Sequence, residues 1–207
     1  MEDPLRADLT PDLGIIETFA ARAGSFPRLA RHLARMEGTA ARLGYGFDRA
    51  EVERLLASLP PGDLRVRLLL APSGLSISHG ALTPNPALWH LAYAAEILDA
   101  DDPWLQVKTT RRALYDRARA ALPAGVDEQV FLNRRGEICE GTITNLFAQG
   151  DGVLLTPPLA SGLLPGCLRA ELLETGAARE AVLRPDDLLG LPLFMGNSLR
   201  GLIPAAF

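Results

Sequence analysis

Residues 134–152 read RRGEICEGTITNLFAQGDG and contain the clearest pattern of turns and strands in the chain. Its charged first part, residues 134–137, predicts a turn that leads into residues 138–141. Residues 142–148 predict a strand, because β-branched and apolar side chains favour extended backbone. Gln-Gly-Asp-Gly at residues 149–152 is typical of a tight hairpin turn. The second half of the chain is therefore expected to be rich in strands.

The first half of the chain predicts strands and helices in alternation. Residues 13–20 predict a strand that ends at the turn-prone segment 24–27. Asp48 can cap a second helix, and residues 64–70 and 75–78 predict two short strands. Before that helix, apolar residues recur at the spacing of a first helix: Leu29, Leu33, Met36, Ala40 and Leu43.

The segment 82–86, Leu-Thr-Pro-Asn-Pro, is the best linker candidate. It predicts a small N-terminal α+β lobe over residues 1–83 and a larger C-terminal lobe over residues 84–207. In the larger lobe we also expect a helix at 111–121, a strand at 129–132, a helix from about 166 to 175 and a strand at 193–195.

Composition excludes several classes of function. The net charge of −4 and the pI near 5.4 argue against a nucleic-acid binder, which usually carries a basic face. Three scattered histidines and two cysteines without a C-x-x-C pair predict no metal site. The polar N-terminus and the lack of a long apolar stretch predict neither signal peptide nor membrane span. A cytoplasmic location is expected.

Lys108 is the only lysine of the chain, against twenty arginines. It stands in Gln-Val-Lys-Thr-Thr, between an apolar stretch and a predicted helix. A lysine amine can form a Schiff base with an aldehyde cofactor and later move a proton. A lone lysine is also commonly a solvated surface charge, and the sequence leaves both interpretations open.

Glu140 is the second candidate, at a turn that leads into strands. A buried carboxylate opposite a pyridine nitrogen would keep that nitrogen protonated and make the ring an electron sink. The alternative is an exposed carboxylate in a hairpin.

Two further segments and one helical arginine carry suitable chemistry. Pro165 and Gly166 directly precede a predicted helix, where free backbone N–H groups and the helix dipole favour a phosphate. Arg35, at the flank of the first helix, either adds positive charge there or is solvated. Residues 196–201 offer a hydroxyl, an amide and the Arg200 guanidinium, which suits a carboxylate or is simply exposed.

Taken in order, these segments resemble the class IV, fold-type IV pyridoxal-phosphate enzymes, which include branched-chain and D-amino-acid aminotransferases and aminodeoxychorismate lyase. The resemblance implies a two-lobe, D-amino-acid aminotransferase-like α+β fold with a strand-rich C-terminal pseudo-barrel. It covers nearly the whole chain from residue 13 in these segments: Ile16–Phe19, Arg31–Met36, Lys108–Thr110, Glu140–Phe147, Leu155–Pro158, Leu163–Arg169 and Asn197–Gly201.

The resemblance implies pyridoxal 5'-phosphate as cofactor and a role for each matching residue. Lys108 would carry the cofactor covalently, Glu140 would meet the pyridine nitrogen, and Arg200 is the candidate for a substrate carboxylate. Asn145 is expected to be structural. The phosphate would be bound by Arg35, the backbone at Cys167 and Leu168, and Ser198.

The segments around Lys108 and at Asn197–Gly201 look most like aminodeoxychorismate lyase, which converts 4-amino-4-deoxychorismate to 4-aminobenzoate and pyruvate for folate synthesis. One alternative is an aminotransferase acting on branched-chain or D-amino acids. Another is a non-catalytic member without cofactor, suggested by the short segment before Glu17. Leu168 departs from the pattern, since many relatives have a threonine there. Relatives are homodimers, so a homodimer that acts on a small-molecule amine is expected.

Overall fold

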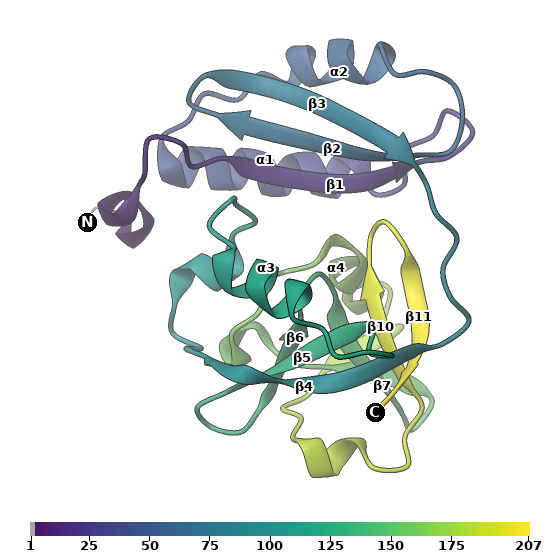
Figure 1. Cartoon of the computed structure of the whole chain (residues 1–207). Helices are drawn as coiled ribbons and strands as arrows, with labels where there is room; N and C mark the ends of the chain where they lie inside the picture. Colours follow the sequence, from purple (N-terminus) through teal and green to yellow (C-terminus); the bar gives the residue numbers. More distant parts are fainter. Residues whose placement is uncertain (1–2) are drawn as a thin grey trace. The chain divides into compact units, whose positions relative to one another are not determined.

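The computed structural model describes residues 3–207, which divide into two compact units (Figure 1). Unit 1 runs up to Pro84 and also contains Val107–Arg111. Unit 2 consists of Asn85–Gln106 and Arg112–Phe207. Lys108 therefore belongs to unit 1 and Glu140 to unit 2.

Among its described residues, unit 1 holds a three-stranded antiparallel sheet in the order β1-β2-β3. Helix α1 packs along β1 and helix α2 packs against β3 (Figure 1). The elements are η1 (Pro4–Asp8), β1 (Ile15–Ala21), α1 (Leu29–Leu43), α2 (Arg49–Ala57), β2 (Leu64–Ala71) and β3 (Gly74–Ala81). The strands and helices predicted for this half are confirmed.

Local chemistry explains where the two helices of unit 1 begin and end. Helix α1 ends at Gly44, whose φ of 78° is in the left-handed region that favours glycine. Asp48 accepts a hydrogen bond from the Ala50 N–H at 2.9 Å and so caps α2, as the sequence predicts.

One face of the sheet in unit 1 contributes to its core. Every second residue of β2 from Val66 to Leu70 is buried. The register partners of these residues on β1 are Phe19, Glu17 and Ile15. Side chains opposite each other in paired strands share a face, so Glu17 lies in an otherwise apolar row. A buried carboxylate in such a row requires partners.

Unit 2 is an eight-stranded sheet, within the described residues, in the order β10-β11-β4-β5-β6-β7-β8-β9. Strand β10 also pairs with β7, which closes six of the strands into a barrel-like sheet and confirms the predicted strand-rich pseudo-barrel. The strands are β4 (Trp89–Leu98), β5 (Glu128–Asn133), β6 (Ile138–Gly141), β7 (Asn145–Gly150), β8 (Val153–Thr156), β9 (Ala178–Glu180), β10 (Leu193–Asn197) and β11 (Gly201–Ala206).

Two helices pack on the sheet of unit 2. Helix α3 (Ala113–Ala120) covers a cluster that includes Phe131 and Cys139, and α4 (Cys167–Glu174) lies near the cluster of Phe147 and Leu154. The largest apolar cluster of unit 2 joins side chains from β4, β5, β6, β7, β10 and β11. Short 3-10 helices lie at η2 (Pro103–Gln106), η3 (Leu159–Ser161) and η4 (Pro185–Leu188).

The strand predicted over residues 142–148 begins later than expected. Strand β7 starts at Asn145, and residues 142–144 form a turn instead. The reason is Glu128, whose carboxylate accepts hydrogen bonds from this turn. The hairpin predicted at residues 149–152 is confirmed, since Gly150 pairs with Val153. Within the described residues every helix is too short or too polar to cross a bilayer.

Candidate active site

Lys108 lies on a segment that runs beside β1. Its carbonyl oxygen accepts a hydrogen bond from the Ile16 N–H at 2.8 Å, and Ile15 forms a bridge pair with Thr109. Thr109 lies opposite Ile15 in this bridge, and Lys108 is the residue directly before it. Lys108 is half-buried. The backbone of the candidate lysine is thus fixed against β1.

Glu17 binds two side chains of α1. Arg35 donates from Nε to Oε1 and from Nη2 to Oε2, both at 2.7 Å, and His32 Nδ1 lies 2.5 Å from Oε2. Burial alone would raise the pKa of Glu17, but the charge of Arg35 and the hydrogen bonds of His32 and Arg35 outweigh it and lower that pKa to about 2. An ionised carboxylate thus orients Arg35, the predicted phosphate ligand. The two bonds to Glu17 use two of the five N–H donors of the Arg35 guanidinium.

Glu140 lies on β6 at an irregularity in the sheet of unit 2. Val130 of β5 is opposite Gly141, and Leu132 is opposite Ile138, so β6 advances three residues while β5 advances two. Such a bulge inserts one extra residue and can redirect a side chain. Ile138 belongs to the apolar cluster of the barrel-like sheet, whereas Glu140 reaches groups outside that cluster.

The Glu140 carboxylate is buried and accepts hydrogen bonds on both oxygens. The Tyr115 hydroxyl donates to Oε1 at 2.7 Å, and the Leu164 N–H donates to Oε2 at 3.1 Å. Only 6% of the Glu140 surface is exposed. The interpretation of Glu140 as an exposed hairpin carboxylate is therefore wrong.

A second buried carboxylate, Glu128, shapes the turn after Glu140. Its oxygens accept hydrogen bonds from the N–H and hydroxyl of Thr142 and from the hydroxyl of Thr144. A Cβ added to Gly141 would lie 2.5 Å from Thr144 Oγ1 and 3.0 Å from Glu128 Cδ, so the turn requires glycine there. These contacts fix the path of the chain just beyond Glu140.

The turn before α4 has the features predicted for a phosphate site. Gly166 is the N-cap of α4 and offers no side chain to cap the first N–H groups, which include those of Cys167 and Leu168. Asn145 donates from Nδ2 to the Leu164 carbonyl at 3.0 Å. A Cβ at Gly166 would lie 2.0 Å from Asn145 Oδ1. Asn145 therefore shapes this turn, in keeping with its expected structural role.

Ser198 lies in the turn between β10 and β11 and is 8% exposed. The end of β10, just before this turn, lies close to the start of α4, because a Cβ added to Gly196 would lie 3.1 Å from Leu168 Cδ2. Unit 2 thus brings together Glu140, the Leu164–Leu168 turn and the turn that carries Ser198.

Arg200, the candidate for a substrate carboxylate, is held at the end of the same turn. Its N–H donates to Asn197 Oδ1 at 2.9 Å, and its Nη1 donates to Asn85 Oδ1 at 3.1 Å. The guanidinium carbon lies 5.9 Å from the centroid of the Trp89 ring. The interpretation of Arg200 as a simple exposed turn arginine is wrong, because Asn85 and Trp89 contact its side chain.

A further network supports the loop that leads to Leu164. Arg135 pairs with both oxygens of Glu137, at 3.0 and 2.9 Å, and Asn133 and Ser161 each donate to Oε2 at 2.9 Å. The Arg135 and Asn133 hydrogen bonds lower the pKa of Glu137 to about 2, with burial opposing and Ser161 adding to the effect. The network ties the turn between β5 and β6 to Ser161. Ser161 lies three residues before Leu164, whose N–H donates to Glu140.

Sequence reasoning missed several residues that position the site. Tyr115 and Glu128 gave no signal, because their partners lie many residues away in the chain. Glu17 did offer one: it is the charged residue of a strand that, apart from Thr18, is otherwise apolar. A charged residue in such a strand either faces solvent or is buried with a partner of opposite charge. Arg35, on the helix that directly follows β1, was therefore a candidate partner for Glu17.

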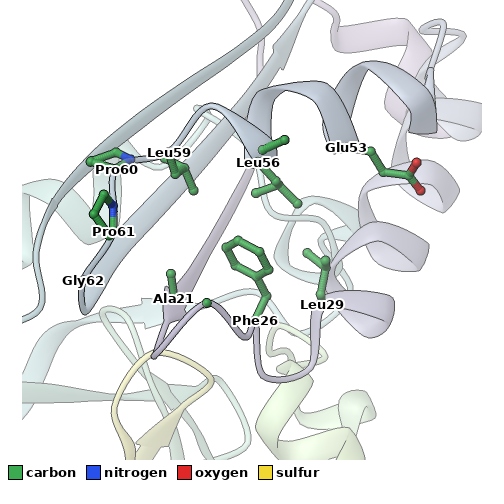
Figure 2. A pocket seen from close by; sticks show the side chains of 11 residues that line it. Ala21, Phe26, Leu29, Glu53, Leu56, Leu59, Pro60, Pro61 and Gly62 are labelled. Atoms are coloured by element: carbon green, nitrogen blue, oxygen red, sulfur yellow. The ribbon is translucent and has the colours of Figure 1, made fainter.

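Unit 1 also has a cavity of about 460 Å³ near the end of β1. Figure 2 shows Phe26, Leu29 and Leu56 around it, while the Glu53 carboxylate points away. None of the predicted site residues lines this cavity. It therefore plays no part in the candidate active site.

Comparisons with known proteins show a family match and several similar sequences and structures. The model of the family amino-transferase class IV matches residues 14–206. A solved structure from Mesorhizobium loti, described as "Putative amino-acid aminotransferase", is 47% identical with a TM-score of 0.89, over 94% of this chain and 99% of that one. The "Putative aminodeoxychorismate lyase" of Schizosaccharomyces pombe is 31% identical over 189 residues, which are 83% of this chain and 80% of that protein. The 4-amino-4-deoxychorismate lyase of Pseudomonas aeruginosa is 28% identical with a TM-score of 0.77, over 93% and 82%.

Proposed function

The chain belongs to the class IV aminotransferase family, and from this premise we propose that it is a lyase that converts 4-amino-4-deoxychorismate to 4-aminobenzoate and pyruvate. Members of this family are enzymes that use pyridoxal phosphate. The bound cofactor supplies an electron sink for negative charge that forms on the substrate carbon bearing nitrogen. The observation that carries the assignment of residues is the buried Glu140 carboxylate beside the turn at Leu164–Leu168.

In unit 1, we assign Lys108 as the covalent carrier of the cofactor and as the group that moves the substrate proton. The backbone pairing with β1 holds Lys108 in place, which limits the entropy lost when the amine is positioned. Arg35 is assigned to the cofactor phosphate. Glu17 holds the Arg35 guanidinium in a fixed orientation, and a planar fork of donors suits a phosphate.

In unit 2, we assign Glu140 to the ring nitrogen, where an ionised carboxylate holds a proton on that nitrogen. The N–H groups of Cys167 and Leu168 and the Ser198 hydroxyl are assigned to the phosphate. Support comes from the start of α4, where the helix dipole favours an anion and Gly166 leaves room for a close approach. These residues fit pyridoxal phosphate: the phosphate would meet Arg35 and the start of α4, and the pyridine nitrogen would meet the Glu140 carboxylate.

We assign Arg200 to a carboxylate of the substrate. Asn85 and Trp89 fix its side chain, and a fixed guanidinium loses less entropy when it binds a carboxylate. The choice of 4-amino-4-deoxychorismate rests on the two similar proteins described as lyases of that compound. We further propose that the enzyme is a cytoplasmic homodimer, to be tested by light scattering of the purified protein.

A second candidate function is transamination of amino acids. It is favoured by one observation, the 47% identity to the Mesorhizobium loti protein described as an amino-acid aminotransferase. Both reactions need the same first steps at Lys108 and Glu140, so the residues described above serve either. The substrate that enters decides between them.

The test is to supply purified protein and pyridoxal phosphate with 4-amino-4-deoxychorismate, and separately with amino-acid and keto-acid pairs. The proposal expects 4-aminobenzoate and pyruvate in equal amounts, and no product from Lys108→Arg, which keeps the charge but cannot carry the cofactor. The control is Arg117→Ala on the exposed side of α3, with activity unchanged. Formation of a new keto acid without 4-aminobenzoate would reject the proposed lyase function and support transamination.

A further inference from the structure

Helix α3 presents one face to the chain just after Glu140. Arg112, Tyr115 and Arg119 recur at spacings of three and four, which places them on the same side of a helix. Arg112 Nη2 donates to the Thr142 carbonyl at 3.3 Å, and Arg119 Nη1 donates to Thr142 Oγ1 at 3.2 Å. Between them, the Tyr115 hydroxyl donates to Glu140 Oε1 at 2.7 Å.

The ring of Tyr115 is held from two sides, so its hydroxyl has a fixed position. It meets the Phe131 ring edge-to-face, with centroids 5.2 Å apart and an interplanar angle of 77°. The Arg112 guanidinium carbon lies 5.9 Å from its centroid on another side. Such contacts favour one orientation of an aromatic side chain.

We propose that Tyr115 is a positioning residue for Glu140: its hydroxyl holds the carboxylate in one rotation, so that Glu140 binds the protonated ring nitrogen of pyridoxal phosphate. This proposal rests on the proposed function, which assigns Glu140 to that nitrogen. Tyr115 itself need not touch the cofactor.

The direction of the hydrogen bond supports the proposal. Burial and the nearby charge of Glu140 raise the pKa of Tyr115, so the phenol keeps its proton and acts as the donor. Glu140 then acts as the acceptor, with Tyr115 on one oxygen and the Leu164 N–H on the other. A carboxylate has about four lone-pair sites, so it can accept several hydrogen bonds at once.

Loss of the Tyr115 hydroxyl leaves the shape of the site nearly the same but removes a hydrogen-bond donor from the Glu140 carboxylate. A buried carboxylate that loses a donor shifts toward its neutral, protonated form. The ring nitrogen then loses an anionic partner, and binding of the protonated ring weakens. A ring with carbon in place of that nitrogen makes no such bond. Its binding is insensitive to the hydroxyl.

The experiment compares pyridoxal phosphate with its 1-deaza analogue, in which CH replaces the ring nitrogen, by titrating each into the apoprotein. Wild type is expected to prefer pyridoxal phosphate, and Tyr115→Phe to reduce this preference about ten-fold, since a hydrogen bond to a charged group contributes at least that factor. In the Glu140→Gln background, Tyr115→Phe should change the preference little.

The matched control is Tyr93→Phe, which removes a hydroxyl from a ring stacked on Phe207 at 4.3 Å. It is expected to leave the preference unchanged. If Tyr115→Phe does not fold, 3-fluorotyrosine at position 115 provides the test, because a more acidic phenol is a stronger donor and should increase the preference.

The outcomes separate the two proposals. If Tyr115→Phe weakens both ligands equally, Tyr115 is only part of the packing and the inference is overturned, while the proposed function stands. If wild type binds neither ligand, or does not distinguish them, the assignment of Glu140 fails and this inference fails with it.

Discussion

Arg35 and Glu17 form a two-point ion pair in which both N–H···O bonds measure 2.7 Å and Glu17 is fully buried. The residue before Glu17, Ile16, uses its N–H to bind the Lys108 carbonyl. One strand, β1, therefore holds the candidate phosphate ligand through a side chain and the candidate lysine through its backbone. Strand β1 therefore supports both of the residues in unit 1 that we propose to bind the cofactor.

Arg35→Ala should weaken both the fold and cofactor binding, because it leaves the buried Glu17 carboxylate without its main partner. Removal of one member of a buried ion pair costs about 3–5 kcal/mol. Chemical unfolding and a pyridoxal phosphate titration measure the two effects. The matched control is Arg42→Ala on the same helix, whose pair with Asp3 is partly exposed and screened by solvent, so its loss should cost far less than that of Arg35. Equal losses in the two variants would contradict this account of Glu17.

Stability should fall in acid between about pH 4.5 and pH 2. The pKa of Glu17 falls from 4.5 to about 2 on folding, so its contribution is complete above pH 4.5 and is lost as pH decreases toward 2. The difference corresponds to roughly 3 kcal/mol. The thermal midpoint of Glu17→Gln should therefore fall less than that of wild type from pH 6 to pH 3. The exposed Glu53→Gln should behave as wild type, and an identical pH profile for Glu17→Gln would refute the assignment.

The predictability of the fold depended on how far apart in the chain the interacting residues lie. Helices α1 and α2 follow from local spacing and caps, and so were predicted. Strand β4 was not predicted, because apolar residues point to both of its faces and half-exposed ones such as Ile97 break the alternation. Strand β11 was missed because a proline argues against a strand. Pro204 is tolerated because β11 pairs with β4 only at Ala205 and Ala206, after the proline.

The same distinction applies to the candidate site. Lys108 and Glu140 stand in local motifs and could be singled out from the sequence. The pairing of Lys108 with β1 could not, because it joins residues about ninety positions apart. The Tyr115 and Glu128 contacts also depend on long-range packing and on the bulge in β6, neither of which leaves a local pattern.

Gly166→Ala should disturb the turn before α4. The new Cβ would lie 2.0 Å from Asn145 Oδ1, so either the turn or Asn145 must move. Overpacking of this kind costs about 1–3 kcal/mol, and pyridoxal phosphate should bind more weakly. Gly38→Ala in α1 is the control. Apart from its chain neighbours and the backbone of its own helix, no described atom lies within 4 Å of its new Cβ, and alanine should stabilise the helix by up to about 1 kcal/mol. Unchanged cofactor affinity in Gly166→Ala would count against the phosphate site.

Glu128→Ala should lower the stability of unit 2, because it leaves the polar groups of the 142–144 turn without their acceptor. Loss of a buried, multiply bonded carboxylate is expected to cost about 3–5 kcal/mol. Hydrogen exchange of the Thr142 and Ile143 amides, which donate to Glu128, measures the effect locally. Protection equal to that of wild type would show that Glu128 does not hold this turn.

The most direct measurement concerns Lys108. The purified chain is incubated with pyridoxal phosphate, reduced with borohydride and digested, and the modified peptide is identified by mass spectrometry. The chain has only two primary amines, the Lys108 side chain and the N-terminus. We predict stoichiometric phosphopyridoxyl label on Lys108. Label confined to the N-terminus, or none, would contradict the assignment of Lys108 as the cofactor carrier.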